Sequence, residues 1–167
     1  MWSAAIAGAV LLLIATRGAA GTPAQDCAAA KLKAAGKKAA AVLNCHRKAA
    51  KLGAAIDPAC VTPTDEKLQT LFGRAEAKGG CAVSGDEPVV RGQIDQWVTD
   101  LATLLRPSTT ANACAGLKLR VTGKKVLGKL RCHSSALRRD VATDAECLAK
   151  VEQKYQERFA AAEASPP

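Results

Sequence analysis

The sequence predicts an all-α fold: two tandem disulfide-stapled antiparallel αα-hairpins plus one connecting helix, five helices in total. Three observations support this. Long segments are rich in Ala, Lys and Leu and are bounded by Gly and Pro, the chain repeats itself without a gap, and the cysteines are spaced to join facing helices. No segment alternates apolar and polar residues with a period of two, so no sheet is expected.

The repeat appears when the chain is compared with itself at a shift of 87 residues. Rare residues then coincide in the pairs Cys27/Cys114, Cys45/Cys132, His46/His133, Cys60/Cys147 and Phe72/Phe159. We therefore expect a duplicated module, residues 25–107 and 108–167, with the same local fold in both copies. The counterpart of Cys81 would be residue 168, and segment 86–105 has no counterpart. We expect either a chain cut short or a second copy that has diverged into a terminal cap.

In the first module, capping residues mark the expected helices. The first helix, 25–52, is made of good helix formers and stops at Gly53. Asp57-Pro58 supplies an N-cap followed by proline at the first helical position, and this second helix runs to about Lys78.

The connecting helix opens at Asp86-Glu87-Pro88 and ends at Arg106-Pro107. Its apolar residues recur at helical spacing, which predicts one buried face: Val90, Ile94, Trp97, Val98, Leu101, Leu104 and Leu105. In the second module, helices at about 112–140 and 143–164 repeat the first two.

The N-terminus resembles an export signal. An apolar run of about twelve residues, Ala4 to Ala15, is too short for a comfortable membrane span and is followed by small residues. We expect residues 1–20 to be a signal peptide cleaved near Ala20 or Ala24, with retention as an anchor as the alternative. The expected location is therefore secreted or periplasmic, where cysteines pair.

Helix geometry restricts the pairing of the cysteines. Cys27 and Cys45 are 18 residues apart on one helix, ~27 Å, which is too far for a disulfide. Residues that face each other across an antiparallel hairpin have nearly constant index sums, which are 105 for Cys45 with Cys60 and 108 for Cys27 with Cys81. We therefore expect these two bonds, together with Cys132–Cys147 in the second module. Cys114 is left as a free thiol or as the link of a disulfide-bonded dimer.

Each of the two histidines directly follows a cysteine. The groups Cys27…Cys45-His46 and Cys114…Cys132-His133 resemble an expanded c-type haem attachment motif, which would imply a dihaem electron-transfer protein. The competing interpretation places the histidines on the core face of their helices as structural residues and needs no cofactor. A zinc site of Cys45, His46 and Cys60 lacks a fourth ligand, so no metal is expected.

Charge is unevenly distributed along the chain, which has 24 Lys and Arg against 15 Asp and Glu. Seven cations and no acid lie between Cys27 and Lys51, and eight cations and no acid lie between Cys114 and Arg139. One interpretation is a solvated face whose cations pair with acids of the facing helix. The other is a cationic surface for anionic envelope lipid or polysaccharide. Specific nucleic-acid binding is not expected, because aromatics are only 3% and no known motif is present.

No catalytic constellation is visible, so the protein is not expected to be an enzyme. The stretches KLKAAGKKAA…NCHRKAAKLG…DPAC and FGRAEAKGGCAVSGD resemble a loose group of secreted, Ala/Lys-rich, cysteine-repeat bacterial proteins. The resemblance spans about Cys27 to Leu105, recurs in the second module, and carries no activity with it. The expected function is that of a disulfide-stabilised helical repeat acting as a binding or structural module.

Overall fold

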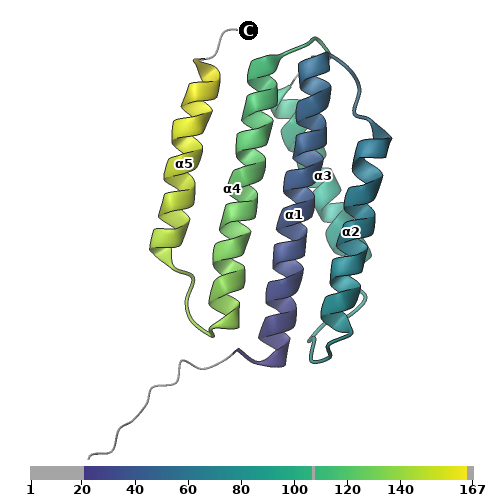
Figure 1. Cartoon of the computed structure of the whole chain (residues 1–167), viewed down its shortest axis with the longest axis vertical. Coiled ribbons are helices and arrows are strands. Elements are labelled where there is room, and N and C mark those ends of the chain that lie inside the picture. Colours follow the sequence, from purple (N-terminus) through teal and green to yellow (C-terminus); the bar gives the residue numbers. More distant parts are fainter. Residues whose placement is uncertain (1–20, 107, 165–167) are drawn as a thin grey trace, which may run out of the picture.

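The computed structural model describes residues 21–106 and 108–164, and within these ranges it contains five helices and no strand. The helices are α1 (Pro23–Leu52), α2 (Pro58–Glu76), α3 (Glu87–Leu105), α4 (Ala113–Arg138) and α5 (Ala145–Glu163) (Figure 1). The predicted all-α fold of disulfide-stapled hairpins is confirmed. The predicted signal peptide, residues 1–20, lies outside the described residues.

Local capping explains where the helices begin. α1 opens with a capping box in which Thr22 and Gln25 exchange hydrogen bonds, and it ends at Gly53 in the left-handed conformation with φ 64°. α4 and α5 are capped by Asn112 and Asp144, whose side chains accept hydrogen bonds from backbone N–H groups of the first turn. α3 alone lacks such a bond, because the Asp86 carboxylate is engaged elsewhere.

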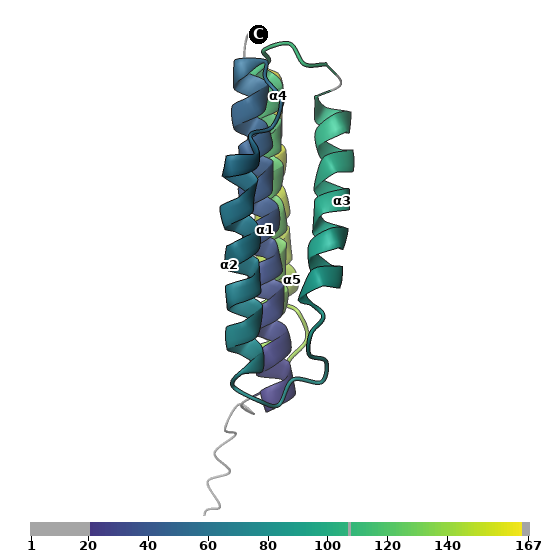
Figure 2. The same cartoon turned by 90° about the vertical axis from the view of Figure 1, so that its right-hand side faces the viewer.

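Four helices form one flat layer in the order α2, α1, α4, α5, with each helix antiparallel to its neighbour (Figure 1). The fifth, α3, lies on one face of this layer (Figure 2). It packs mainly against α1 and also touches α2 and α4. The opposite face of the layer has no helix over it among the described residues.

The centre of the layer is the seam between α1 and α4, the most extensive helix contact. A Cβ atom at Gly36 would lie 3.2 Å from Leu130, and a Cβ atom at Gly123 would lie 3.5 Å from Leu43. Gly36 and Gly123 are equivalent in the repeat, as are Leu43 and Leu130, so the contact is reciprocal. The two modules are thus related by an approximate two-fold axis, as in an isologous dimer.

The two modules share one hydrophobic core. Leu43 of α1, Val98 of α3 and Leu119 of α4 are fully buried in a single cluster. Within α3, however, Trp97 and Leu104 are exposed, which corrects the expectation that all its periodic apolar residues are buried. The buried stripe of α3 is narrow because only one side of this helix meets the layer.

The structure joins the cysteines in the pairs that the index sums predict. Cys45–Cys60 and Cys132–Cys147 lie near the hairpin turns, with Cα–Cα distances of 5.9 and 6.0 Å. Cys27–Cys81 ties the open end of the first hairpin, with a Cα–Cα distance of 5.3 Å. The remaining cysteine, Cys114, is a half-buried free thiol. Three disulfides are typical of proteins that work outside the reducing cytosol.

Candidate functional site

The cations of α1 and α4 fall into two sets, of which the first is paired with acids across each hairpin. Lys31 of α1 binds Glu76 of α2 at 2.7 Å, and its repeat equivalent Lys118 binds Glu163 of α5 at 3.0 Å. The same relation holds for Lys38–Asp65 and Lys125–Glu152. Hairpin pairing, the first of the two interpretations of the basic helices, therefore accounts for these lysines.

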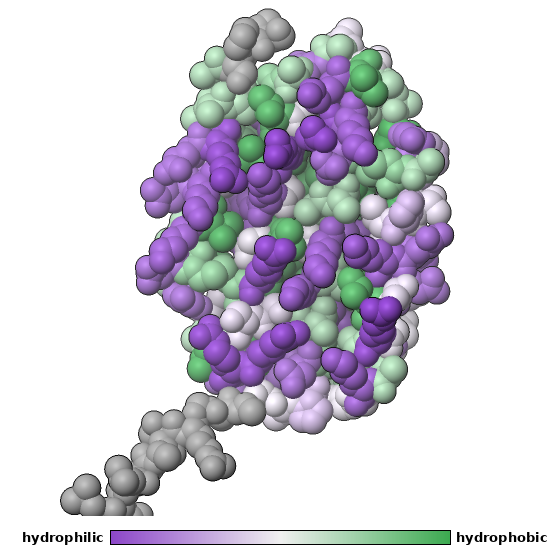
Figure 3. Space-filling model, in the orientation of Figure 1, coloured by the Kyte–Doolittle hydropathy of each residue, from purple (hydrophilic) through white to green (hydrophobic). Residues whose placement is uncertain are grey.

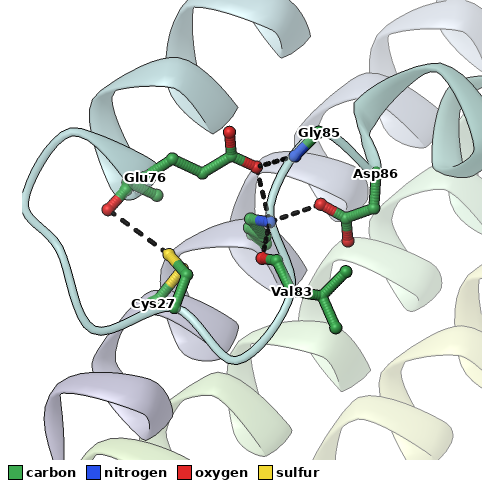
Figure 4. A network of polar contacts seen from close by, with 8 residues as sticks. Cys27, Glu76, Val83, Gly85 and Asp86 are labelled. Atoms are coloured by element: carbon green, nitrogen blue, oxygen red, sulfur yellow. Dashed lines mark hydrogen bonds and ion pairs between the residues drawn. A yellow bond between two sulfur atoms is a disulfide. The ribbon is translucent and has the colours of Figure 1, made fainter.

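α3 contributes second acids to the first module. Its cap residue Asp86 binds Lys31, and Asp95 binds Lys38 at 2.7 Å. The acids Glu76 and Asp86 converge with the Val83 carbonyl on the Lys31 ammonium, while the Gly85 N–H donates to Glu76 (Figure 4). Burial lowers the pKa of Lys31, but the hydrogen bonds to Asp86 and Glu76 outweigh it and raise that pKa overall. The hydrogen bond from Lys31 lowers the pKa of Asp86.

The second set of cations lies on the opposite side of α1 and α4, away from α3. Helical spacing relative to the core residues Leu43 and Leu119 places them there. We call this surface the basic face, and its central members are Lys33, Lys37, Lys48, Arg120, Lys124 and Arg131. None of the six forms an ion pair with a residue that the structure describes. Hydrophilic side chains are spread across this face in Figure 3.

Two shallow grooves cross the basic face, one on each hairpin. The groove between α1 and α2 has a volume of about 460 Å³ and is lined by Lys37 and Lys67. The groove between α4 and α5 has a volume of about 300 Å³ and is lined by Arg120, Lys124 and Arg158. Because Lys37 and Lys124 are repeat equivalents, the approximate two-fold axis places one basic groove on each side of the α1–α4 seam.

Positive charges crowd together at one of these grooves. The positive charge of Arg120, then burial, then the charge of Arg158 lower the pKa of Lys124. Like charges held together in this way destabilise the charged ammonium. An anion bound between the three side chains would relieve that repulsion, so the groove favours anionic ligands.

Neither histidine lies in the core, which corrects the expectation of a structural core histidine. His46 is half-buried, and its pKa is lowered by burial and then by the charge of Arg106 at the end of α3. His133 is exposed, and its Nδ1 lies 2.9 Å from the Thr143 hydroxyl. The two environments differ because α3 covers only the first module.

The residues of the haem alternative do not fit a porphyrin in this arrangement. Cys27 and Cys45 lie 18 residues apart on one continuous helix, and both are held in disulfides. In the second module Cys132 is also bonded, which leaves Cys114 as the only free thiol among the described residues. The Cys45–Cys60 bond likewise removes both thiolates of the zinc alternative. Within the described ranges, no three His, Cys, Asp or Glu side chains gather as metal ligands.

The sequence contained a signal that would have separated the two sets of cations. Cys45 faces α2, and Lys31 and Lys38 precede it by fourteen and seven residues, so all three share one stripe of α1. Lys33 and Lys37 fall outside this stripe. The position of the disulfide therefore indicates which lysines face an acid and which face solvent.

None of the described helices has the length and apolar character needed to cross a membrane. Comparisons of the chain with protein-family models, with curated proteins and with solved structures found no match. The resemblance to secreted, Ala/Lys-rich, cysteine-repeat proteins therefore rests on the sequence motifs alone.

Proposed function

We propose that the protein is an exported binding module that holds anionic polysaccharide on its basic face. One observation carries the proposal: α1 and α4 present six cations on one side of a flat layer, and none of them is neutralised by an acid of the described chain. The acids that the hairpins do supply are used on the other set of lysines. A surface with uncompensated charge of one sign attracts ligands of the opposite sign.

A polysaccharide suits this face better than a membrane does. Surfaces that adsorb to lipid bury apolar side chains among the headgroups in addition to their charge. Of the exposed large apolar side chains that the structure describes, Leu117 is the one that lines a basic groove, and it is 36% exposed. A chain of carboxylated or sulfated sugars needs only spaced cations and shallow grooves, which are the features present.

The disulfides support a role outside the cytosol and a rigid binding surface. Both basic grooves are bounded by helices that a disulfide ties together, so little conformational freedom is lost on binding. Release of the exported protein from the membrane requires removal of the N-terminal signal, and we propose cleavage near Ala20. A cut there leaves the Thr22 cap of α1 intact, whereas a cut after Ala24 removes it.

Charge neutralisation on the basic face tests the proposal. The variant Lys37→Gln with Lys124→Gln removes one cation from each groove, and the control Arg91→Gln with Lys129→Gln removes two from the α3 side. A Lys or Arg near an anionic lipid surface contributes ~1 kcal/mol, and we use the same value for a polyanion at low salt. The groove variant should therefore bind heparin or polygalacturonate roughly 30-fold more weakly, while the control binds as the parent does.

The same titrations with vesicles of anionic and of neutral lipid separate the two sources of negative charge. Binding to polysaccharide with weak or no binding to vesicles is the expected result. Equal losses in the groove and control variants would show that net charge alone governs binding. That result, or tighter binding to anionic vesicles than to either polysaccharide, would refute the proposal.

A further inference from the structure

The approximate two-fold axis relates residues that have the same identity or type but differ in burial. Leu43 is fully buried beneath α3, whereas its equivalent Leu130 is only half-buried. Ala50 is fully buried in the same place, whereas its equivalent Leu137 is only half-buried. The difference follows from α3, which covers the first module and has no counterpart over the second among the described residues.

A cavity marks the position that a counterpart of α3 would fill. It has a volume of about 360 Å³, and its apolar lining includes Leu32, Leu130 and Leu137. These are the two-fold equivalents of Leu119, Leu43 and Ala50, the residues that form one core cluster with Val98 and Ala102 of α3. We call this surface, with the neighbouring Lys118 and Lys125, the open face.

Within the described part of the chain, the lysines of the open face lack the second acid that α3 gives to their equivalents, just as its apolar residues lack a covering helix. In the first module, α3 gives Lys31 and Lys38 a second acid each, through Asp86 and Asp95. Among the described residues, the equivalents Lys118 and Lys125 each bind a single acid, Glu163 and Glu152 of α5. Their side chains are 22% and 25% exposed, against 10% and 1% for Lys31 and Lys38. The open face therefore presents two lysines at the positions where α3 presents carboxylates to their equivalents.

We propose that the open face is a docking site for an amphipathic helix of a partner protein, built like α3. Such a helix carries apolar residues at the spacing of Ile94, Val98, Leu101 and Leu105, and acids nine residues apart to meet Lys118 and Lys125. Helices that lay an apolar face in a groove are a common mode of peptide recognition. A second copy of this chain is a poorer occupant, because two open faces in contact would bring their lysines together.

A peptide of residues 86–106 with a fluorescent label is a direct probe, since it has the required pattern. Anisotropy titration with the full chain should show saturable binding. Leu130→Glu in the chain should weaken binding at least about tenfold, because it places a charge in the apolar contact. Leu117→Glu, on the basic face, is the matched control and should leave binding unchanged. Circular dichroism of both variants verifies that the helices are retained.

The charge requirement is tested in the peptide, which avoids any effect on folding. Asp86→Asn with Asp95→Asn in the peptide should weaken binding about fivefold at low ionic strength. Lack of binding up to the solubility limit of the peptide overturns the proposal, as does binding that Leu130→Glu leaves unchanged. A chain that dimerises in sedimentation, and becomes monomeric with Leu130→Glu, would show that a second copy occupies the face and also overturns it.

Discussion

The paired leucines Leu43 and Leu130 offer a quantitative test of the architecture. They are equivalent in the repeat, and both lie beside the glycine of the opposite central helix. Only Leu43 is fully buried. Replacing each in turn by alanine removes the same three carbon atoms, so the difference in stability between the two variants reports the covering by α3.

The expected loss for Leu43→Ala is ~3–4 kcal/mol, because removal of a fully buried leucine side chain costs its transfer free energy and leaves a cavity. Part of the Leu130 side chain is already in contact with water. Shortening it to alanine leaves an open depression that solvent fills. Leu130→Ala should therefore cost only ~1–2 kcal/mol. The gap of ~2 kcal/mol corresponds to a difference in Tm of roughly 4–8 °C for a chain of this size.

Urea unfolding followed by far-UV circular dichroism measures both free energies, with the disulfides intact and no reductant present. Equal m-values for the two variants are required before the free energies are compared. Equal losses would refute the assignment of α3 to one module only. If Leu43→Ala lowers the free energy of unfolding less than Leu130→Ala does, the hydrophobic core does not lie beneath α3 as described.

Three further outcomes follow from the disulfides and the buried ion pairs. Replacing Cys27 and Cys81 by alanine should lower the free energy of unfolding in urea by ~4 kcal/mol, because this disulfide closes a loop of 54 residues. The loss for Cys45–Cys60 or Cys132–Cys147, each with a separation of 15 residues, should be smaller, ~3 kcal/mol. The pKa of Asp86 is lowered in the folded state, so its contribution to stability is present above its unfolded value of 3.8 and is lost as the pH falls through the folded pKa. Urea unfolding measured at decreasing pH should show this fall in the free energy of unfolding. The fall should be smaller in the Asp86→Asn variant. Lys38→Met should cost ~1–3 kcal/mol in urea unfolding, because it leaves two carboxylates unpaired, and should cost more than Lys125→Met; the reverse order would contradict the burial of Lys38.

Local signals made the helices and disulfides predictable. Gly53 determines where α1 ends, and Asp57-Pro58 determines where α2 begins. These residues act on the adjacent backbone whatever the tertiary fold. The disulfides follow from the geometry of a single hairpin, since a pair such as Cys45 and Cys60 needs only two facing helices. These features depend on short stretches of chain, which is why the sequence alone was sufficient.

The arrangement of the hairpins was less accessible, because it depends on contacts between distant segments. Gly36 and Gly123 interrupt helical runs at equivalent positions, and this coincidence was a signal for the close approach of α1 and α4. The side of the layer on which α3 lies leaves no mark in helical periodicity. For this reason the exposure of Trp97 and Leu104 and the different surroundings of His46 and His133 emerged only in three dimensions.

The reciprocal glycine contact between α1 and α4 has a consequence for the ancestry of the chain. An ancestral protein with one hairpin would carry only the glycine equivalent to Gly36. It would form a homodimer in which two identical helices pack against each other across this glycine. Fusion of two such genes makes the partnership unimolecular and independent of dilution. It also allows the two halves to diverge: in this chain α3 covers the first half, and no described helix covers the second.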